Sequence, residues 1–183
     1  MAIVHGRGPS GEAKPLCVDE WTWQLITIGY IHHEIHEGDT YQVSYFADDV
    51  ADSSKIIILL RVGDVPAHMT YEADAGADAT IELLENPTVN DAGTAMTEYN
   101  QNRTSANTAT VTAFHTPTLV GGTQLVIQLA PGGRGPQAGG GSARADSEWI
   151  LDSNEDYAIQ ITNISGQAQP MSVLVEWYEE KSH

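Results

Sequence analysis

The chain has 183 residues, with 25 acidic and 8 basic side chains and a formal net charge of −17, so its surface would repel duplex DNA and anionic membranes. A content of 41% hydrophobic and 18% charged residues excludes a disordered chain, and no apolar run reaches the ~18 residues that a membrane-spanning helix needs. The single cysteine, Cys17, excludes an intramolecular disulfide, and this agrees with folding in a reducing cytosol.

The first 20 residues are rich in glycine, proline and small polar residues, and they predict an extended N-terminal arm (1–20). Such a segment buries too little apolar surface to fold alone. Two states of the arm remain open: a free segment, and one that becomes ordered against a neighbouring subunit. In the second state the interface would use apolar side chains of the arm and of its junction with the domain, namely Ile3, Val4, Leu16, Val18, Trp21 and Trp23.

From residue 21 onward the pattern predicts a single β domain (21–183). An alternating run over 21–36 leads to a turn at 37–39 and to a second alternating strand at 41–45. A polar loop is expected at 48–54. The continuous apolar run at 56–62 predicts a strand that is buried on both faces.

The remaining strands are predicted from alternation and from the turn residues between them. They are 68–73, 80–85, 108–115, 124–130, 148–151, 157–164 and 171–178, with one helical candidate at 90–97. Trp149 and Trp177 are expected in the core. About ten short strands predict an all-β fold, a jelly-roll-like antiparallel β-sandwich with an extended N-terminal arm.

A histidine-rich segment is the obvious place to look for a metal site. On a strand, His32, Glu34 and His36 would share one face, with the two histidines ~13 Å apart. Two ligands of one ion cannot be that far apart, because their bonds are near ~2 Å long. We therefore expect a solvated strand face and no cofactor, and keep these three residues as metal candidates that would need help from elsewhere.

Other motifs carry little chemistry. The Gly-rich segment 132–142 lacks the lysine of a phosphate-binding loop and predicts a connection between strands. No Gly-x-Ser-x-Gly motif occurs. Asp48, Asp49 and Asp52 could offer oxygens to calcium, although the spacing of an EF-hand is absent. We expect a protein that is not an enzyme.

Several segments together resemble a known family. In chain order they are Tyr99-Asn100-Gln101-Asn102-Arg103, the Gly-rich loop, Arg144, Glu148-Trp149-Ile150-Leu151, Asn154, Tyr157, Ile161 and Glu176-Trp177-Tyr178-Glu179. This order is similar to that of tailed-bacteriophage virion structural proteins of the head decoration, or cement, type. The resemblance covers roughly residues 37–179, and its motifs are strand and turn residues.

The resemblance implies a non-enzymatic protein that decorates and stabilises the outer surface of the capsid by bridging capsomers. It also implies the major capsid protein as a partner, a homotrimer, and synthesis in the host cytoplasm, with no direct nucleic-acid or membrane contact. Two alternatives remain open. One is a tail-associated or receptor-binding module that holds carbohydrate, and the other is a cupin-like metalloenzyme suggested by the histidine cluster.

Overall fold

The computed structural model describes residues 5–7, 13–15, 29–131 and 148–179, and the chain divides into two units, 1–33 and 34–183. In the first unit, β1 (His5–Arg7) and β2 (Ala13–Pro15) form an antiparallel pair in which His5 lies opposite Pro15. The predicted arm and the predicted domain boundary at residue 20 lie largely outside the described residues, so both stay predictions.

The predicted strand over 21–36 is wrong where the structure describes it, because residues 30–37 form the helix α1 (Tyr30–Glu37). The helix ends in a Schellman motif at Gly38, whose φ is +81°. The amide of Asp39 donates to the carbonyl of Glu34 (3.1 Å), and that of Gly38 donates to the carbonyl of Ile35 (3.1 Å). The Glu-Gly-Asp segment that predicted a turn between strands is therefore a helix C-cap.

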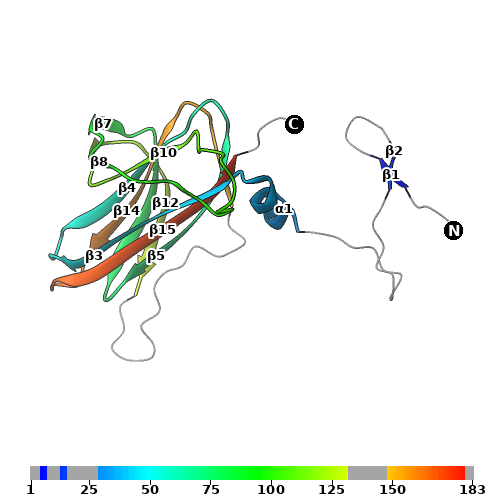
Figure 1. Cartoon of the computed structure of the whole chain (residues 1–183). Helices are drawn as coiled ribbons and strands as arrows, with labels where there is room; N and C mark the ends of the chain where they lie inside the picture. The colour runs from blue at the N-terminus through cyan, green and yellow to red at the C-terminus, as the bar shows by residue number, and fades with distance from the viewer. Residues whose placement is uncertain (1–4, 8–12, 16–28, 132–147, 180–183) are drawn as a thin grey trace, which may run out of the picture. The chain divides into compact units, whose positions relative to one another are not determined.

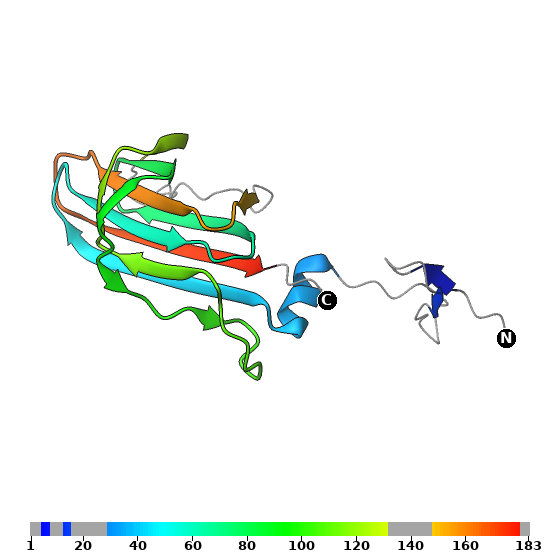
Figure 2. The same ribbon diagram turned by 90° about the horizontal axis from the view of Figure 1, so that it is seen from above.

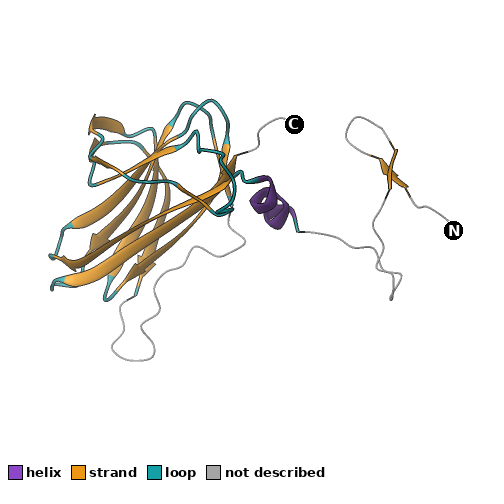
Figure 3. Ribbon diagram, viewed as in Figure 1, coloured by secondary structure: helices purple, strands orange, loops and turns teal. Residues whose placement is uncertain are grey.

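The second unit is built from antiparallel sheets (Figures 1 and 3). One sheet has five strands in the order β13-β5-β15-β3-β9, and the other has six in the order β12-β6-β14-β4-β10-β8. The long strands of the first are β3 (Thr40–Val50), β5 (Ala67–Ala75) and β15 (Gln169–Glu179), with β9 (Tyr99–Asn100) and β13 (Trp149–Leu151) at its edges. Those of the second are β4 (Lys55–Arg61), β6 (Ala79–Glu85), β12 (Thr123–Ala130) and β14 (Asp156–Asn163), with β8 (Thr94–Ala95) and β10 (Thr112–His115) beyond β4.

From β3 to β6, and again from β12 to β15, the chain alternates between the two sheets, whereas β6 and β12 pair within one sheet. Short connections carry the chain from β3 to β4, from β5 to β6 and from β14 to β15, so each of these pairs spans both sheets, as Figure 2 shows from above. The edge strands β12 and β13 therefore flank β6 and β5 on the same side of the unit. The all-β sandwich predicted from the sequence is confirmed.

The core lies between the sheets and is formed by the inward-facing residues of each strand. On β15 these are Val173, Val175 and Trp177, and on β14 they are Tyr157, Ile159 and Ile161, as the alternation predicted. Trp177 is 2% exposed, and Trp149 packs against the core from the edge. Residues 56–60 are all buried, which confirms the strand predicted to be covered on both faces.

Residues 86–122 run from β6 to the far edge of both sheets and back to β12. They contain β7 (Thr88–Asp91), which pairs with β11 (Thr118–Val120), together with the short strands β8, β9 and β10. The helix predicted at 90–97 is therefore wrong, because this segment pairs with strands distant in the sequence. The strand predicted at 108–115 begins only at Thr112. The loop predicted at 48–54 begins after Val50 because β3 continues through Asp48 and Asp49.

Among the described residues, no helix is long and apolar enough to cross a membrane.

Candidate functional site

The residues predicted to form an interface lie outside the part of the chain that the structure describes. These residues are Ile3, Val4, Leu16, Val18, Trp21 and Trp23. Cys17 and the Gly-rich segment 132–142 also lie outside it.

The histidine candidates lie on α1 and not on a strand, so the ~13 Å separation expected for His32 and His36 on a strand is wrong. Glu34 is buried, whereas both histidines are exposed. Asp52 is engaged in a turn, where its carboxylate accepts a hydrogen bond from the amide of Gly166 (2.8 Å). Within the described residues no group of three or more His, Cys, Asp or Glu side chains is arranged to hold a metal ion.

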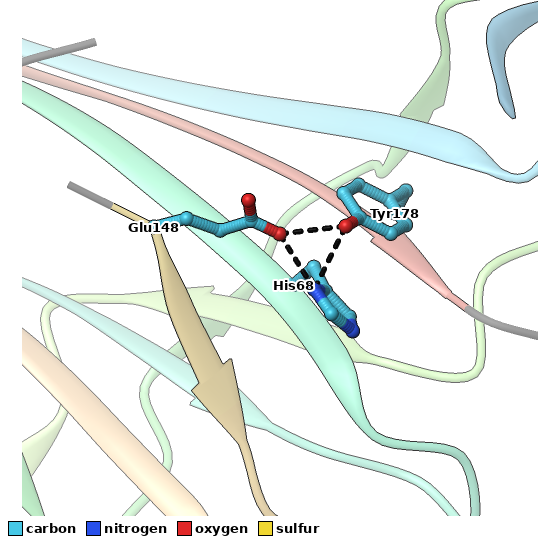
Figure 4. Close-up of polar contacts among 3 residues, drawn as sticks. All are labelled: His68, Glu148 and Tyr178. Atoms are coloured by element: carbon cyan, nitrogen blue, oxygen red, sulfur yellow. Dashed lines mark hydrogen bonds and ion pairs between the residues drawn. The ribbon is translucent and has the colours of Figure 1, made fainter. Parts of the chain in front are cut away.

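A polar cluster ties three neighbouring strands together on the outer face of the five-stranded sheet. Figure 4 shows Glu148, at the start of β13, reaching over β5 to Tyr178 on β15, with His68 of β5 between them. The Tyr178 hydroxyl donates to Glu148 Oε1 (2.6 Å) and lies 2.8 Å from His68 Nδ1. His68 Nδ1 is 2.5 Å from the same Glu148 oxygen. The rings of His68 and Tyr178 stack with their centroids 4.4 Å apart.

These contacts stabilise the charged form of Glu148. The hydrogen bond from Tyr178 lowers the pKa of Glu148 most, burial opposes it, and the hydrogen bond and charge of His68 lower it further. The cluster links the short edge strand β13 to β5 and β15. We call Glu148, His68 and Tyr178 the clamp, and its contribution to stability depends on the charge of Glu148.

A hollow of about 380 Å³ opens on the side of this sheet where β9 pairs with β3. It is lined by Gln42, Tyr99, Asn100, Gln101 and Arg103. Gln101 Nε2 donates to Glu176 Oε1 on β15 (2.7 Å) and lies 3.5 Å from Gln42 Oε1. The Arg103 guanidinium lies 5.6 Å from the centroid of the Tyr99 ring, and Tyr99 is 52% exposed.

Asparagine side chains fix the wall of the hollow to the end of α1. Asn100 Nδ2 donates to the carbonyls of Gly38 (2.7 Å) and Asn107 (3.2 Å), and Asn100 Oδ1 accepts from the amide of Asn102 (2.8 Å). The side chains of Asn102 and Asn107 donate to the carbonyls of His36 (3.1 Å) and Glu37 (3.2 Å). The asparagine-rich stretch therefore supplies the partners that the last helical carbonyls need.

A buried carboxylate holds the end of β15 to residues 110–111. Glu179 is 0% exposed, and its oxygens accept hydrogen bonds from the amides of Thr110 (2.8 Å) and Val111 (3.0 Å). Glu179 Oε1 also accepts from Trp177 Nε1 (3.2 Å). The last three residues of the Glu-Trp-Tyr-Glu segment are therefore structural. Trp177 fills the core, Tyr178 belongs to the clamp, and Glu179 accepts hydrogen bonds from backbone amides.

The edge strand β12 carries an uncharged apolar surface. Its sequence is TQLVIQLA, and among the described residues it pairs with β6 alone. Ile127 and Leu129 lie on the outer face and are each 62% exposed. On the edge of the other sheet, Ile150 of β13 is 67% exposed.

Comparison with known proteins identifies no relative: no family model, no curated protein and no solved structure matches the chain.

Neither the hollow nor the clamp is predicted by the sequence. Residues 99–103 and 176–179 stand out there only through the family resemblance. Alternation does place His68, Glu176 and Tyr178 on the outward faces of their strands. It does not tell which strands are neighbours, so it cannot bring these side chains together.

Proposed function

We propose that the chain is a non-enzymatic structural protein of a tailed-bacteriophage virion, which decorates the outer surface of the capsid and stabilises it by bridging capsomers. Its partners in this proposal are the major capsid protein and further copies of itself in a homotrimer. The observation that carries the proposal is the uncharged apolar edge strand β12 on a strongly acidic β-sandwich.

Exposed edge strands invite pairing with other chains, and proteins usually protect them with charged residues, proline or a covering segment. β12 has one bulge, between Gln124 and Val126, but neither charge nor proline along its eight residues. Ile127 and Leu129 add apolar side chains that a partner would bury. An edge of this kind is suited to strand addition or to apolar contact with another protein.

The charge of the chain supports an outward-facing position. A net charge of −17 disfavours contact with packaged nucleic acid, whereas it keeps many identical copies soluble before they assemble. Repeated contacts over a shell would then stabilise it by multivalency, even where each contact is weak.

The proposal includes the narrower fold description, a jelly-roll-like arrangement. The order β13-β5-β15-β3 in one sheet and β12-β6-β14-β4 in the other supports it, because a jelly roll is built from eight strands in two packed sheets. Jelly rolls occur in viral capsid proteins and in lectins, so this order by itself does not select the function.

The direct test adds the purified protein to capsid shells that lack it. We expect saturable binding and a higher temperature of shell rupture. Ile127→Glu should weaken binding by about tenfold or more, because it places a charge in an apolar contact. Ile164→Glu, which changes an isoleucine that is 48% exposed after β14, is the matched control and should bind as the unchanged protein does. Absence of binding, with equal rupture temperatures, would refute the proposal.

A tail-associated, carbohydrate-binding module is the second candidate, and the hollow beside Tyr99 favours it. Location separates the two functions. A labelled antibody against the protein would mark the tail tip in this case, and the head in the first.

A further inference from the structure

The hollow beside Tyr99 combines an exposed aromatic ring with side chains that can donate or accept further hydrogen bonds. We propose that it binds a neutral saccharide, with Tyr99 as the stacking surface and with Gln42, Gln101 and Arg103 as the hydrogen-bonding groups. This proposal does not depend on the decoration function; it rests on the second candidate function, the carbohydrate-binding module, and names the ligand class and the residues of its site.

The chemistry of Glu176 fixes the orientation of the amides. A carboxylate only accepts hydrogen bonds, so the amino group of Gln101 faces Glu176 Oε1 at 2.7 Å, and Gln101 Oε1 is left as an acceptor. The same amino group lies 3.5 Å from Gln42 Oε1, which leaves Gln42 Nε2 as a donor. A donor and an acceptor side by side match a sugar hydroxyl, which both donates and accepts.

Charge selects among ligands. Arg103 brings one positive charge to the lining of the hollow, and the Glu176 carboxylate lies next to that lining, bonded to Gln101. A phosphate or an acidic sugar would meet Glu176 and the overall charge of −17, whereas a cation would meet Arg103. A neutral, hydroxyl-rich ligand is repelled by neither charge and can accept hydrogen bonds from Arg103.

The aromatic surface and the size of the hollow also favour a small sugar as the ligand. The apolar C–H face of a sugar ring can stack on the half-exposed ring of Tyr99, whose hydroxyl adds a polar tip. A volume of about 380 Å³ lies at the small end of the ~300–1,000 Å³ range of small-molecule sites. It has room for a monosaccharide or a disaccharide, and its open side lets a longer chain continue outward.

The wall of the site is fixed before any ligand arrives. Asn100 is 9% exposed, and its side chain is held at both ends by backbone groups. Tyr99 and Asn100 also pair with Gln42 and Tyr41 as strand β9. A fixed wall lowers the entropy lost on binding, which favours a weak ligand such as a sugar.

The test uses the full chain and two probes. The first is an array of neutral and sialylated glycans. The second is saturation-transfer NMR with free glucose, galactose, N-acetylglucosamine, maltose and lactose, and with sialyllactose as the acidic comparator. We expect binding to neutral glycans on the array and transfer to at least one neutral sugar, with weaker transfer to sialyllactose. No binding to any neutral glycan, or a preference for the sialylated ones, would overturn the proposal.

Variants place the binding in the hollow. Tyr99→Ala and Gln101→Ala should each weaken neutral-sugar binding by about tenfold, the loss typical of an anchoring side chain, whereas Tyr99→Phe should retain most of it. Phe46→Ala removes another exposed aromatic ring, 65% exposed on β3, and should bind sugar as the unchanged chain does. Equal binding by Tyr99→Ala and the unchanged chain, with matching melting temperatures, would show that the sugar binds elsewhere and would also overturn the proposal.

Discussion

At the residue scale, single polar side chains hold together segments that are far apart in the sequence. Glu148, His68 and Tyr178 join three strands of one sheet, and Glu179 fixes residues 110–111 from a distance of 68 or 69 positions along the chain. Tyr178 and Glu179 lie at the carboxyl end of β15, which pairs with β3, the strand that carries Gln42 of the hollow. Their loss should therefore affect the framework more than any surface property.

The clamp predicts a pH dependence. Because the folded state lowers the pKa of Glu148 from its ordinary 4.5, the carboxylate adds stability above that value. This contribution is lost as the pH falls through the lowered folded-state pKa. Glu148→Gln should therefore melt below the unchanged chain at pH 6, and the gap should narrow towards pH 3. Melting curves at both pH values measure this, and a constant gap would contradict the clamp.

The buried carboxylate predicts a larger effect. Glu179→Ala leaves the amides of Thr110 and Val111 and the Trp177 indole without their acceptor, at a cost of about 2–4 kcal/mol in the free energy of unfolding. Glu179→Gln should lose less, since its carbonyl oxygen still accepts. Glu72→Ala, at an exposed position on β5, serves as the control and should change little. Urea denaturation compares the three, and equal losses for Glu179→Ala and Glu72→Ala would refute the assignment.

At the element scale, the end of α1 and the asparagine-rich stretch depend on each other. A Cβ on Gly38 would clash with the side chain of Ser105, and the φ of +81° is one that other residues rarely adopt. The carbonyl of Gly38 also anchors Asn100. The C-cap of the helix therefore sets the position of the loop that carries Tyr99 and Gln101.

Gly38→Ala tests this coupling. Gly166 is a matched control because its φ is +79° and no atom lies within 4 Å of the added Cβ. Gly166→Ala should cost about 1 kcal/mol from backbone strain alone, and Gly38→Ala should cost more because of the clash with Ser105. Denaturant midpoints give both values. A smaller loss at Gly38 than at Gly166 would contradict the close packing of the cap against Ser105.

The elements that the sequence predicted well are those with a local, repeated pattern. β5, β14 and β15 alternate over seven or more residues, so their faces could be assigned from parity. α1 is not predictable from periodicity because its eight residues have mixed polarity, and a glycine at a helix C-cap has the same sequence signal as one in a turn between strands. The hollow could not be predicted, since Gln42 and Gln101 are 59 positions apart and meet only through the register of β3 and β9.

At the scale of the whole molecule, an acidic sandwich with an uncharged edge is suited to repeated attachment. In the proposed function, the net charge of −17 would keep the protein soluble before it attaches, and β12 offers a strip that carries no charge. The predicted arm (1–20) would add a second contact. Deletion of residues 1–18 is expected to leave the β-sandwich folded and to lower occupancy on particles, which quantitative gel analysis of purified particles measures. Unchanged occupancy would show that the arm does not contribute.

Imaging of intact phage particles tests the central claim most directly. Electron cryomicroscopy with symmetry averaging should show density for this protein at regular positions on the outside of the head, bridging neighbouring capsomers, and absent from particles made without its gene. Its absence from finished particles, or its confinement to the tail tip, would contradict the account.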